Sequence, residues 1–117
     1  MPVTYFASSP STKSRAIQIY LILIGAACRR ETLTYQILAQ RLGYKGAGVL
    51  DRQLGHLMRW CFENRLPPLT VLVVNKKSGL PGGGLVLAED LNADRETVFQ
   101  FDWHAVVPPT ADELPEA

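Results

Sequence analysis

The spacing of apolar residues predicts three helices in the first part of the chain. The first, with Thr12 or Ser14 as its N-cap, ends near Cys28 and is apolar nearly all round, which is typical of a central core helix. The second covers about Tyr35 to Leu42 after the capping residue Thr34, and the third covers about Val49 to Asn64. The residues expected to face inward are Ile17, Tyr20, Leu21 and Ile24 in the first helix, Ile37, Leu38 and Leu42 in the second, and Leu50, Leu54, Leu57, Met58 and Cys61 in the third.

After residue 64 the pattern changes. "LPPLTVLVVN" is a continuous apolar and β-branched run that predicts a buried strand over residues 69 to 75. "KKSG" indicates a turn and "LPGGG" a loop, because consecutive glycines do not suit regular structure. "LVLAEDLNADRETVFQFDW" is expected to open with a short second strand. Asp94 then caps a last helix, about Arg95 to Trp103, with Val98, Phe99 and Trp103 facing inward.

This order of elements predicts an α+β fold that is mainly α, with a winged-helix-like helix-turn-helix and a short β wing. Gly43 follows the last apolar residue of the second helix, where a left-handed residue commonly ends a helix, and "YKGAG" supplies the bend before the third. We expect one domain over residues 1–107. The proline- and acid-rich residues 108–117 are expected to form a flexible tail that folding does not need.

The distribution of charge is more informative than the net charge of +1. Residues 1–77 contain 11 Lys and Arg against 3 Asp and Glu, whereas residues 78–117 contain 1 against 8. A basic first part indicates a nucleic-acid face. The alternative is that the acidic residues simply solvate the C-terminal end of the chain.

The residues that would support catalysis are not arranged for it. Neither of the two histidines has a Ser, Cys, Asp or Glu partner at a spacing that suggests a catalytic pair, and no metal-ligand or phosphate-loop motif is present. We therefore predict no enzymatic activity, no catalytic residue, no metal and no cofactor. The two cysteines are expected to be buried thiols in a reducing cytoplasm. The longest apolar run is too short to span a membrane, so we expect a cytoplasmic protein with no membrane partner.

A basic face is the strongest candidate for chemistry. Arg52, His56 and Arg59 recur at positions i, i+4 and i+7 of the third predicted helix, so they are expected to share one side of it. Arginine can bind guanine edges or phosphates in two-pronged fashion. The alternative is an ordinary solvated face, with the charges of Asp51 and Glu63 nearby.

The segment from Leu33 to about Trp103 resembles the C-terminal DNA-binding domain of the alkylguanine-DNA alkyltransferases and the alkyltransferase-like proteins. "LTYQILAQRLG" resembles the family's "T-Y-x-x-[IL]-A-x-x-[LI]-G" helix, and "RQLGHLM" resembles its "R-A-V-G-x-A-[LM]" recognition helix. "GLPGGGL" and "RETVFQFDW" are similar to its glycine-rich stretch and closing helix. The resemblance implies that Tyr35 and Arg52 serve nucleotide extrusion, with the arginine filling the vacated stack.

The resemblance ends at the reactive site. The alignment puts Thr70, Val71 and Leu72 where the family has its reactive Cys-His-Arg, so alkyl transfer is not expected. We predict a non-catalytic module that binds duplex DNA. The residues expected to contact DNA are Tyr35, Lys45, Arg52, His56 and Arg59, with Lys76 and Lys77 on the wing. The alternative is a small protein-interaction module, such as a prophage- or defence-encoded inhibitor of a nucleic-acid-handling protein, that keeps the fold without DNA binding.

Overall fold

The computed structural model describes residues 3, 5–6, 10–45, 50–76 and 91–116. These residues form a mainly helical α+β structure with a small two-stranded parallel sheet. The elements in chain order are α1 (Thr12–Cys28), β1 (Leu33–Thr34), α2 (Tyr35–Arg41), α3 (Leu50–Glu63), the 3-10 helix η1 (Leu69–Leu72), β2 (Val73–Val74), α4 (Leu91–Gln100) and the 3-10 helices η2 (Trp103–Ala105) and η3 (Ala111–Glu113). Among the described helices, none combines the length and apolarity that crossing a membrane requires.

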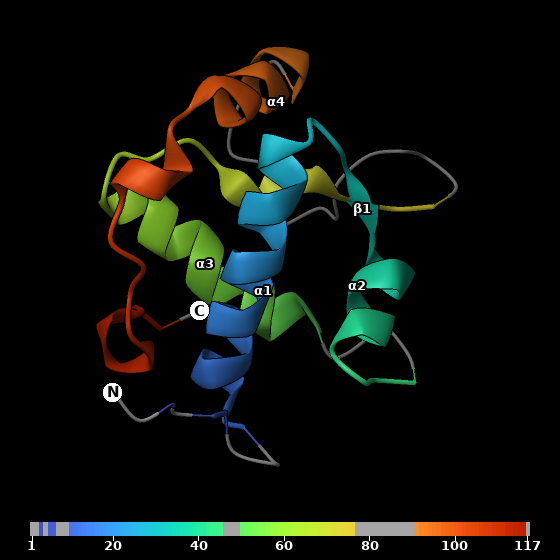
Figure 1. Ribbon diagram of the computed structural model, residues 1–117, viewed down its shortest axis with the longest axis vertical. Helices are drawn as coiled ribbons and strands as arrows, with labels where there is room; N and C mark the ends of the chain where they lie inside the picture. Colours follow the sequence, from blue (N-terminus) through green and yellow to red (C-terminus); the bar gives the residue numbers. More distant parts are fainter. Residues whose placement is uncertain (1–2, 4, 7–9, 46–49, 77–90, 117) are drawn as a thin grey trace.

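Helix α1 is the centre of the molecule, as its sequence predicts, with α3 behind it and α4 across its C-terminal end (Figure 1). Its N-cap is Ser11 instead of Thr12 or Ser14: the Ser11 hydroxyl accepts a hydrogen bond from the Ser14 amide at 3.1 Å. Buried positions lie on the side facing α3 and η1, whereas Leu21 is 50% exposed on the outer side. The buried residues of α1 are Ala16, Ile19, Tyr20, Leu23, Ala26 and Ala27.

The helix pair α1 and α3 forms the main core. The Tyr20 and Trp60 rings meet edge to face, with 5.5 Å between their centroids, a geometry that aromatic pairs favour. The apolar stripe predicted for α3 is buried at Leu50, Leu54, Leu57 and Cys61 and partly buried at Met58. Gln53, His56 and Trp60, which were not assigned to that stripe, are buried beside it.

Local capping explains where α2 begins and ends. The Thr34 hydroxyl accepts a hydrogen bond from the Ile37 amide at 3.1 Å, which confirms the predicted N-cap. Gly43 has a φ of 84°, so the expected left-handed residue after the helix is confirmed. Leu38 and Leu42 face the core as predicted, but Ile37 is 41% exposed.

The predicted strand over residues 69–75 is largely wrong. Residues Leu69–Leu72 form a 3-10 helix after Pro68, and only Val73–Val74 form a strand, which pairs with β1 in parallel register (Leu33 with Val73 and Thr34 with Val74). All six of these residues in η1 and β2 are buried. A short helical turn in contact with α1, α3 and α4 buries four consecutive side chains, so a continuous apolar run does not require a strand here.

Helix α4 begins and ends earlier than predicted. It starts at Leu91, so Asp94 lies inside its first turn and is not the N-cap, and it ends at Gln100, so Trp103 lies in η2. Val98 and Trp103 are buried as expected, and the Trp103 indole donates a hydrogen bond to the Val98 carbonyl at 2.9 Å. The "KKSG" turn beyond Lys76, the glycine-rich loop and the predicted second strand lie outside the described residues.

The predicted flexible tail is docked on the fold. Leu114 is 2% exposed and belongs to the hydrophobic core, and Pro109 is also buried. In Figure 1 the segment after η2 descends beside α3 and places η3 next to the N-terminal half of α1. The core therefore extends past residue 107, because two apolar side chains of the acidic segment find space against the helices.

Candidate nucleic-acid interface

The outer side of α3 is the candidate interface. Its buried residues turn toward α1 and η1, which leaves the opposite side open among the described residues. Arg52 and Arg59 are both exposed on this side, with the half-buried Gly55 between them and Phe62 69% exposed near its end. We term Arg52 and Arg59 the cationic ridge. Their guanidinium groups lie about two turns apart, and Gly55 between them has no side chain, so another molecule can approach the helix closely there.

The two arginines differ in their surroundings. The Arg59 guanidinium lies 3.8 Å from the carboxylate of Glu63, one turn further on. Both side chains are about half exposed, so this ion pair is weak and gives way readily to a stronger anion. Arg52 lies in the first turn of α3, next to Asp51. It is the cation of the ridge nearest to the start of the helix.

His56 is a correction to the predicted face. It is 2% exposed, and its Nδ1 lies 2.8 Å from the Pro115 carbonyl oxygen. Because a carbonyl oxygen can only accept, the imidazole Nδ1–H donates this hydrogen bond. The docked C-terminal segment covers the side of α3 that His56 occupies, so His56 does not lie on the open surface with Arg52 and Arg59.

A partly buried polar cluster connects the residues that follow α2 with α1 and α3. The Arg15 guanidinium of α1 donates to the Leu42 carbonyl at 2.8 Å and lies over the Tyr44 ring, 4.8 Å from its centroid. The Tyr44 hydroxyl in turn accepts a hydrogen bond from the Gln53 amide of α3 at 3.0 Å. These contacts join α1, the end of α2 and the start of α3, so the orientation of the ridge relative to α2 is set by a connected network.

The remaining predicted contact residues lie at varied places. Lys45 is exposed just after this network, whereas Tyr35 is half-buried and packs against the core. Lys76 is exposed after β2 and lines a shallow hollow with residues of β1 and α2, namely Thr34, Gln36, Ile37 and Gln40. Lys77 lies outside the described residues. The structure therefore puts Arg52 and Arg59 on one helix and assigns Lys45 and Lys76 to separate segments.

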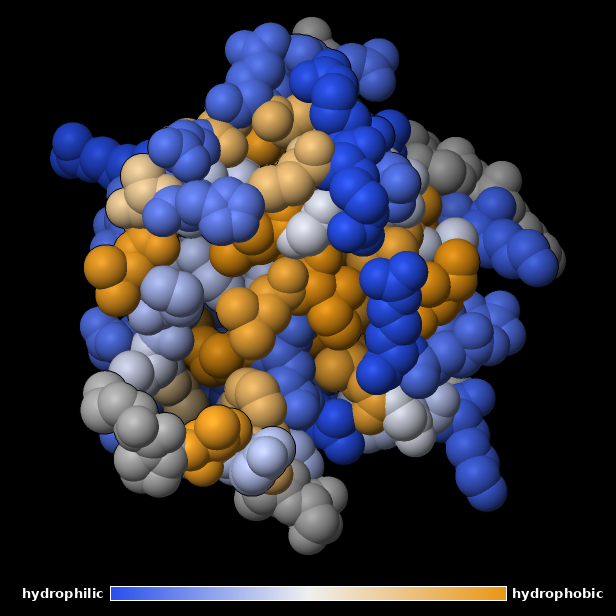
Figure 2. All heavy atoms as spheres, viewed as in Figure 1, coloured by the Kyte–Doolittle hydropathy of each residue, from blue (hydrophilic) through white to orange (hydrophobic). Residues whose placement is uncertain are grey.

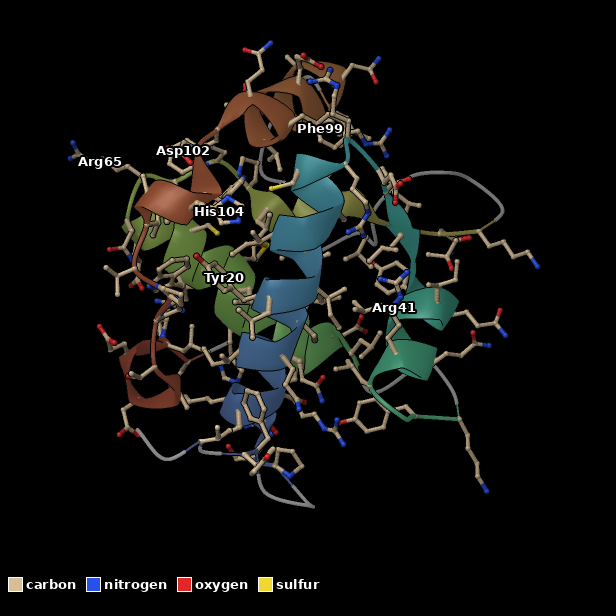
Figure 3. All side chains as sticks on the ribbon, in the orientation of Figure 1. Tyr20, Arg41, Arg65, Phe99, Asp102 and His104 are labelled. Atoms are coloured by element: carbon tan, nitrogen blue, oxygen red, sulfur yellow. The ribbon has the colours of Figure 1, made fainter. Side chains whose placement is uncertain are left out.

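Four exposed arginines of the described residues were not among the predicted contacts, and two of them, Arg29 and Arg30, pair with Glu31 and Glu96. Arg41 ends α2 and projects beside α1, and Arg65 projects outward just beyond α3 (Figure 3). A basic residue in the last turn of a helix is favoured by the helix dipole, and this signal was available in the sequence for Arg41. Neither arginine has a neighbouring motif that distinguishes it as a ligand-binding residue.

Three residues that could act as nucleophiles are Thr70, Cys61 and Cys28, and the first two are buried. Thr70, at the position aligned with the family's reactive cysteine, is fully buried in η1. Burial raises the pKa of the Cys61 thiol to about 11, partly offset by a hydrogen bond from the Leu69 backbone, so Cys61 is protonated at neutral pH. Cys28 is exposed, contrary to prediction, and its sulfur lies 3.9 Å from Nδ1 of His104. This pair offers two metal-ligating atoms, and no group of three is found among the described residues.

The exposed arginines of α3 and the carboxylates of the docked segment are the charges on this side of the molecule that the candidate interface involves.

Comparison of the chain with family models, with curated proteins and with solved structures found no match. The resemblance to the alkyltransferase proteins rests on the motifs between Leu33 and Trp103 alone.

Proposed function

We propose that the protein is a non-enzymatic DNA-binding module with a winged-helix-like fold, and that the outer side of α3 is its reading surface. The observation that carries this proposal is the exposure of Arg52 and Arg59 on a helix whose opposite side packs against α1 and η1. A helix held against the core on one side, with exposed arginines on the other, has the form in which many proteins present a helix to a DNA groove.

Each cation has a distinct role in this proposal. Arg52, at the start of α3, enters the groove and contacts a base edge or fills a vacated stacking position, as the family resemblance implies. Arg59 and the exposed Lys45 and Lys76 contact phosphates on either side, and Lys77 extends that set by its place in the sequence. Tyr35, which is half-buried at the start of α2, contributes its hydroxyl edge to a backbone contact.

The first test is a titration of random-sequence duplex DNA at several salt concentrations. Arg52→Ala is expected to weaken binding by roughly 1–3 kcal/mol, the range for one base-directed arginine. Arg59→Ala is expected to cost less and to reduce the slope of log affinity against log salt by about one, as for a single phosphate contact. The free energy of unfolding is expected to change by less than about 0.5 kcal/mol, because both side chains are exposed.

Arg29→Ala is the matched control. Arg29 is also an exposed arginine, but it lies at the other end of the α1–α3 pair and is paired with Glu31 at 3.2 Å. Its removal lowers the net charge by the same amount without touching the ridge. Equal losses for Arg29→Ala and Arg52→Ala would indicate that only overall charge matters and would contradict a specific role for α3.

A protein-interaction module is the second candidate function, and one observation favours it. Apolar residues gather along the outer side of α1, where Leu21 is half exposed, and charged residues border them (Figure 2). If wild-type protein binds duplex DNA only in the non-specific range of about 10⁻⁴–10⁻⁶ M, and Arg52→Ala leaves that affinity unchanged, the DNA-binding proposal is wrong and this candidate replaces it.

A further inference from the structure

The acidic C-terminal segment is structured and lies against α1 and α3. Leu114 is buried in the core, and the turn before it is closed by a capping box in which the Glu113 carboxylate accepts from the Thr110 amide and hydroxyl, both at 3.0 Å. The hydrogen bond from the Thr110 amide holds the pKa of Glu113 below its ordinary value. Residues 109–116, which we term the C-terminal strap, are thus anchored at Pro109 and Leu114.

The end of the strap reaches α3 at His56, next to the side that carries Arg52. The Pro115 carbonyl accepts a hydrogen bond from His56, one turn after Arg52 on the same helix. The Glu116 carboxylate lies 3.0 Å from the Lys13 ammonium of α1. The Lys13 hydrogen bond and charge lower the pKa of Glu116, and the nearby His56 and Arg52 act in the same direction. The Glu116 carboxylate is therefore held by the Lys13 ammonium of α1, and the Pro115 carbonyl before it by the His56 N–H of α3.

We propose that the C-terminal strap is an intramolecular competitor for polyanions: the Glu116 carboxylate, which follows the Pro115 carbonyl bound by His56 one turn after Arg52, occupies space that a DNA phosphate takes in the complex. This inference rests on the proposed function and describes the regulation of the same surface. The groups that receive the strap are an imidazole N–H and one ammonium group, which are the kinds of donor that phosphate oxygens also require.

The contacts of Leu114 and Glu116 differ in strength, and this difference allows the end of the strap to release while its anchor at Leu114 stays. Leu114 is almost fully buried, whereas the Glu116 side chain is 77% exposed and its partner Lys13 is 30% exposed. An exposed ion pair is weak and is screened by salt. Residues 115 and 116 follow the anchor, so they can leave Lys13 and His56 while Leu114 keeps its place in the core, and displacement does not require the domain to unfold.

The test compares the full-length wild type with Glu116→Gln and Glu116→Lys in binding to a random-sequence DNA duplex of about two helical turns at low salt. Glu116→Gln is expected to tighten binding about two- to fivefold, the equivalent of losing one weak surface charge interaction, and Glu116→Lys to tighten it further. Glu31→Gln is the matched control, because it removes one exposed negative charge at the far end of α1 and should leave the affinity nearly unchanged.

Nuclear magnetic resonance of the wild type supplies an independent readout. On addition of the duplex, the amide of Glu116 and the imidazole of His56 are expected to shift toward the values of an undocked chain, whereas the amide of Leu114 should keep its shift. Glu116 and Leu114 belong to the strap, and His56 belongs to the helix that it contacts. Shifts at Glu116 and His56 without a shift at Leu114 therefore distinguish release of the strap's end from unfolding of the domain.

The possible outcomes distinguish the two proposals. If the wild type binds duplex DNA and both Glu116 variants bind with the same affinity, or if Glu31→Gln tightens binding as much as Glu116→Gln, the strap does not compete and this inference is wrong while the DNA-binding function stands. If neither the wild type nor any variant binds duplex DNA while Glu116 and His56 resonate as docked groups, the proposed function is wrong and the competition falls with it.

Discussion

Replacement of Leu114 by alanine tests whether the C-terminal segment is part of the folded domain. Leu114 is 2% exposed and packs in the core cluster that also contains residues of α1 and α3. Leu→Ala changes in cores cost about 2–5 kcal/mol, and we expect about 2–3 kcal/mol here because the residue lies at the edge of the core, in a segment that can partly collapse. For a chain of 117 residues this corresponds to a fall in Tm of roughly 6–15 °C.

Urea and thermal unfolding followed by tryptophan fluorescence measure this loss, because Trp60 and Trp103 both lie in the core. Val107→Ala is the matched control: Val107 is an apolar residue of the same C-terminal region but is 84% exposed, so its removal is expected to change stability by less than about 0.5 kcal/mol. If Leu114→Ala and Val107→Ala melt alike and close to the wild type, the segment does not dock and the reasoning about the strap loses its anchor.

Three further outcomes follow from individual contacts. Native protein should react with one equivalent of a thiol reagent at neutral pH, at the exposed Cys28, and with two after unfolding, because burial raises the pKa of Cys61 to about 11; two rapid equivalents in the native state would contradict this. The hydrogen bond from Arg30 lowers the pKa of Glu96 in the folded state, so that stabilisation is present above the ordinary carboxyl pKa and is lost as pH falls through the folded value. Glu96→Gln should therefore flatten the acid side of a plot of urea midpoint against pH, and an unchanged slope would refute the contact. Arg15→Met should cost about 1–2 kcal/mol of stability, measured by urea unfolding, because it removes the hydrogen bond to the carbonyl at the end of α2 while retaining the apolar stem.

The first three helices could be predicted closely because their signals are local. Thr34 both ends β1 and caps α2, and Gly43 supplies the left-handed residue after that helix, so two positions bracket the element. The 3.6-residue spacing of apolar positions in α3 predicted most of its buried side. His56 lies beside that predicted stripe. Its burial depends on a segment about 60 positions away, so the periodicity of the helix could not predict it.

The η1 segment could not be predicted from its residues. A run in which each side chain is apolar has no alternation, so it fits a buried strand and a buried helical turn equally well. Pro68 precedes the run with a φ of −75°, which is compatible with either outcome. The surrounding helices decide the outcome: η1 contacts α1, α3 and α4, and all four of its residues are buried.

The docking of the tail does not follow from its amino-acid composition. Prolines and carboxylates indicate disorder on average. The spacing of Thr110 and Glu113, followed at once by Leu114, is nonetheless a capping signal next to an apolar residue, and it is the feature that the structure uses. This signal could have identified the turn, although it could not have identified the surface that receives Leu114.

The central position of α1 has a consequence for the synthesis of the chain. This helix is made before the residues that cover it, which belong to α3, to η1 and, last among them, to the segment that contains Leu114, 86 positions after Cys28. At translation rates of about 5–20 residues per second, synthesis from Cys28 to Leu114 takes roughly 4–17 seconds. During that interval part of the apolar surface of α1 is exposed to other proteins. Termination of translation before residue 114 yields a fragment in which this surface stays exposed, and such a fragment is prone to aggregate.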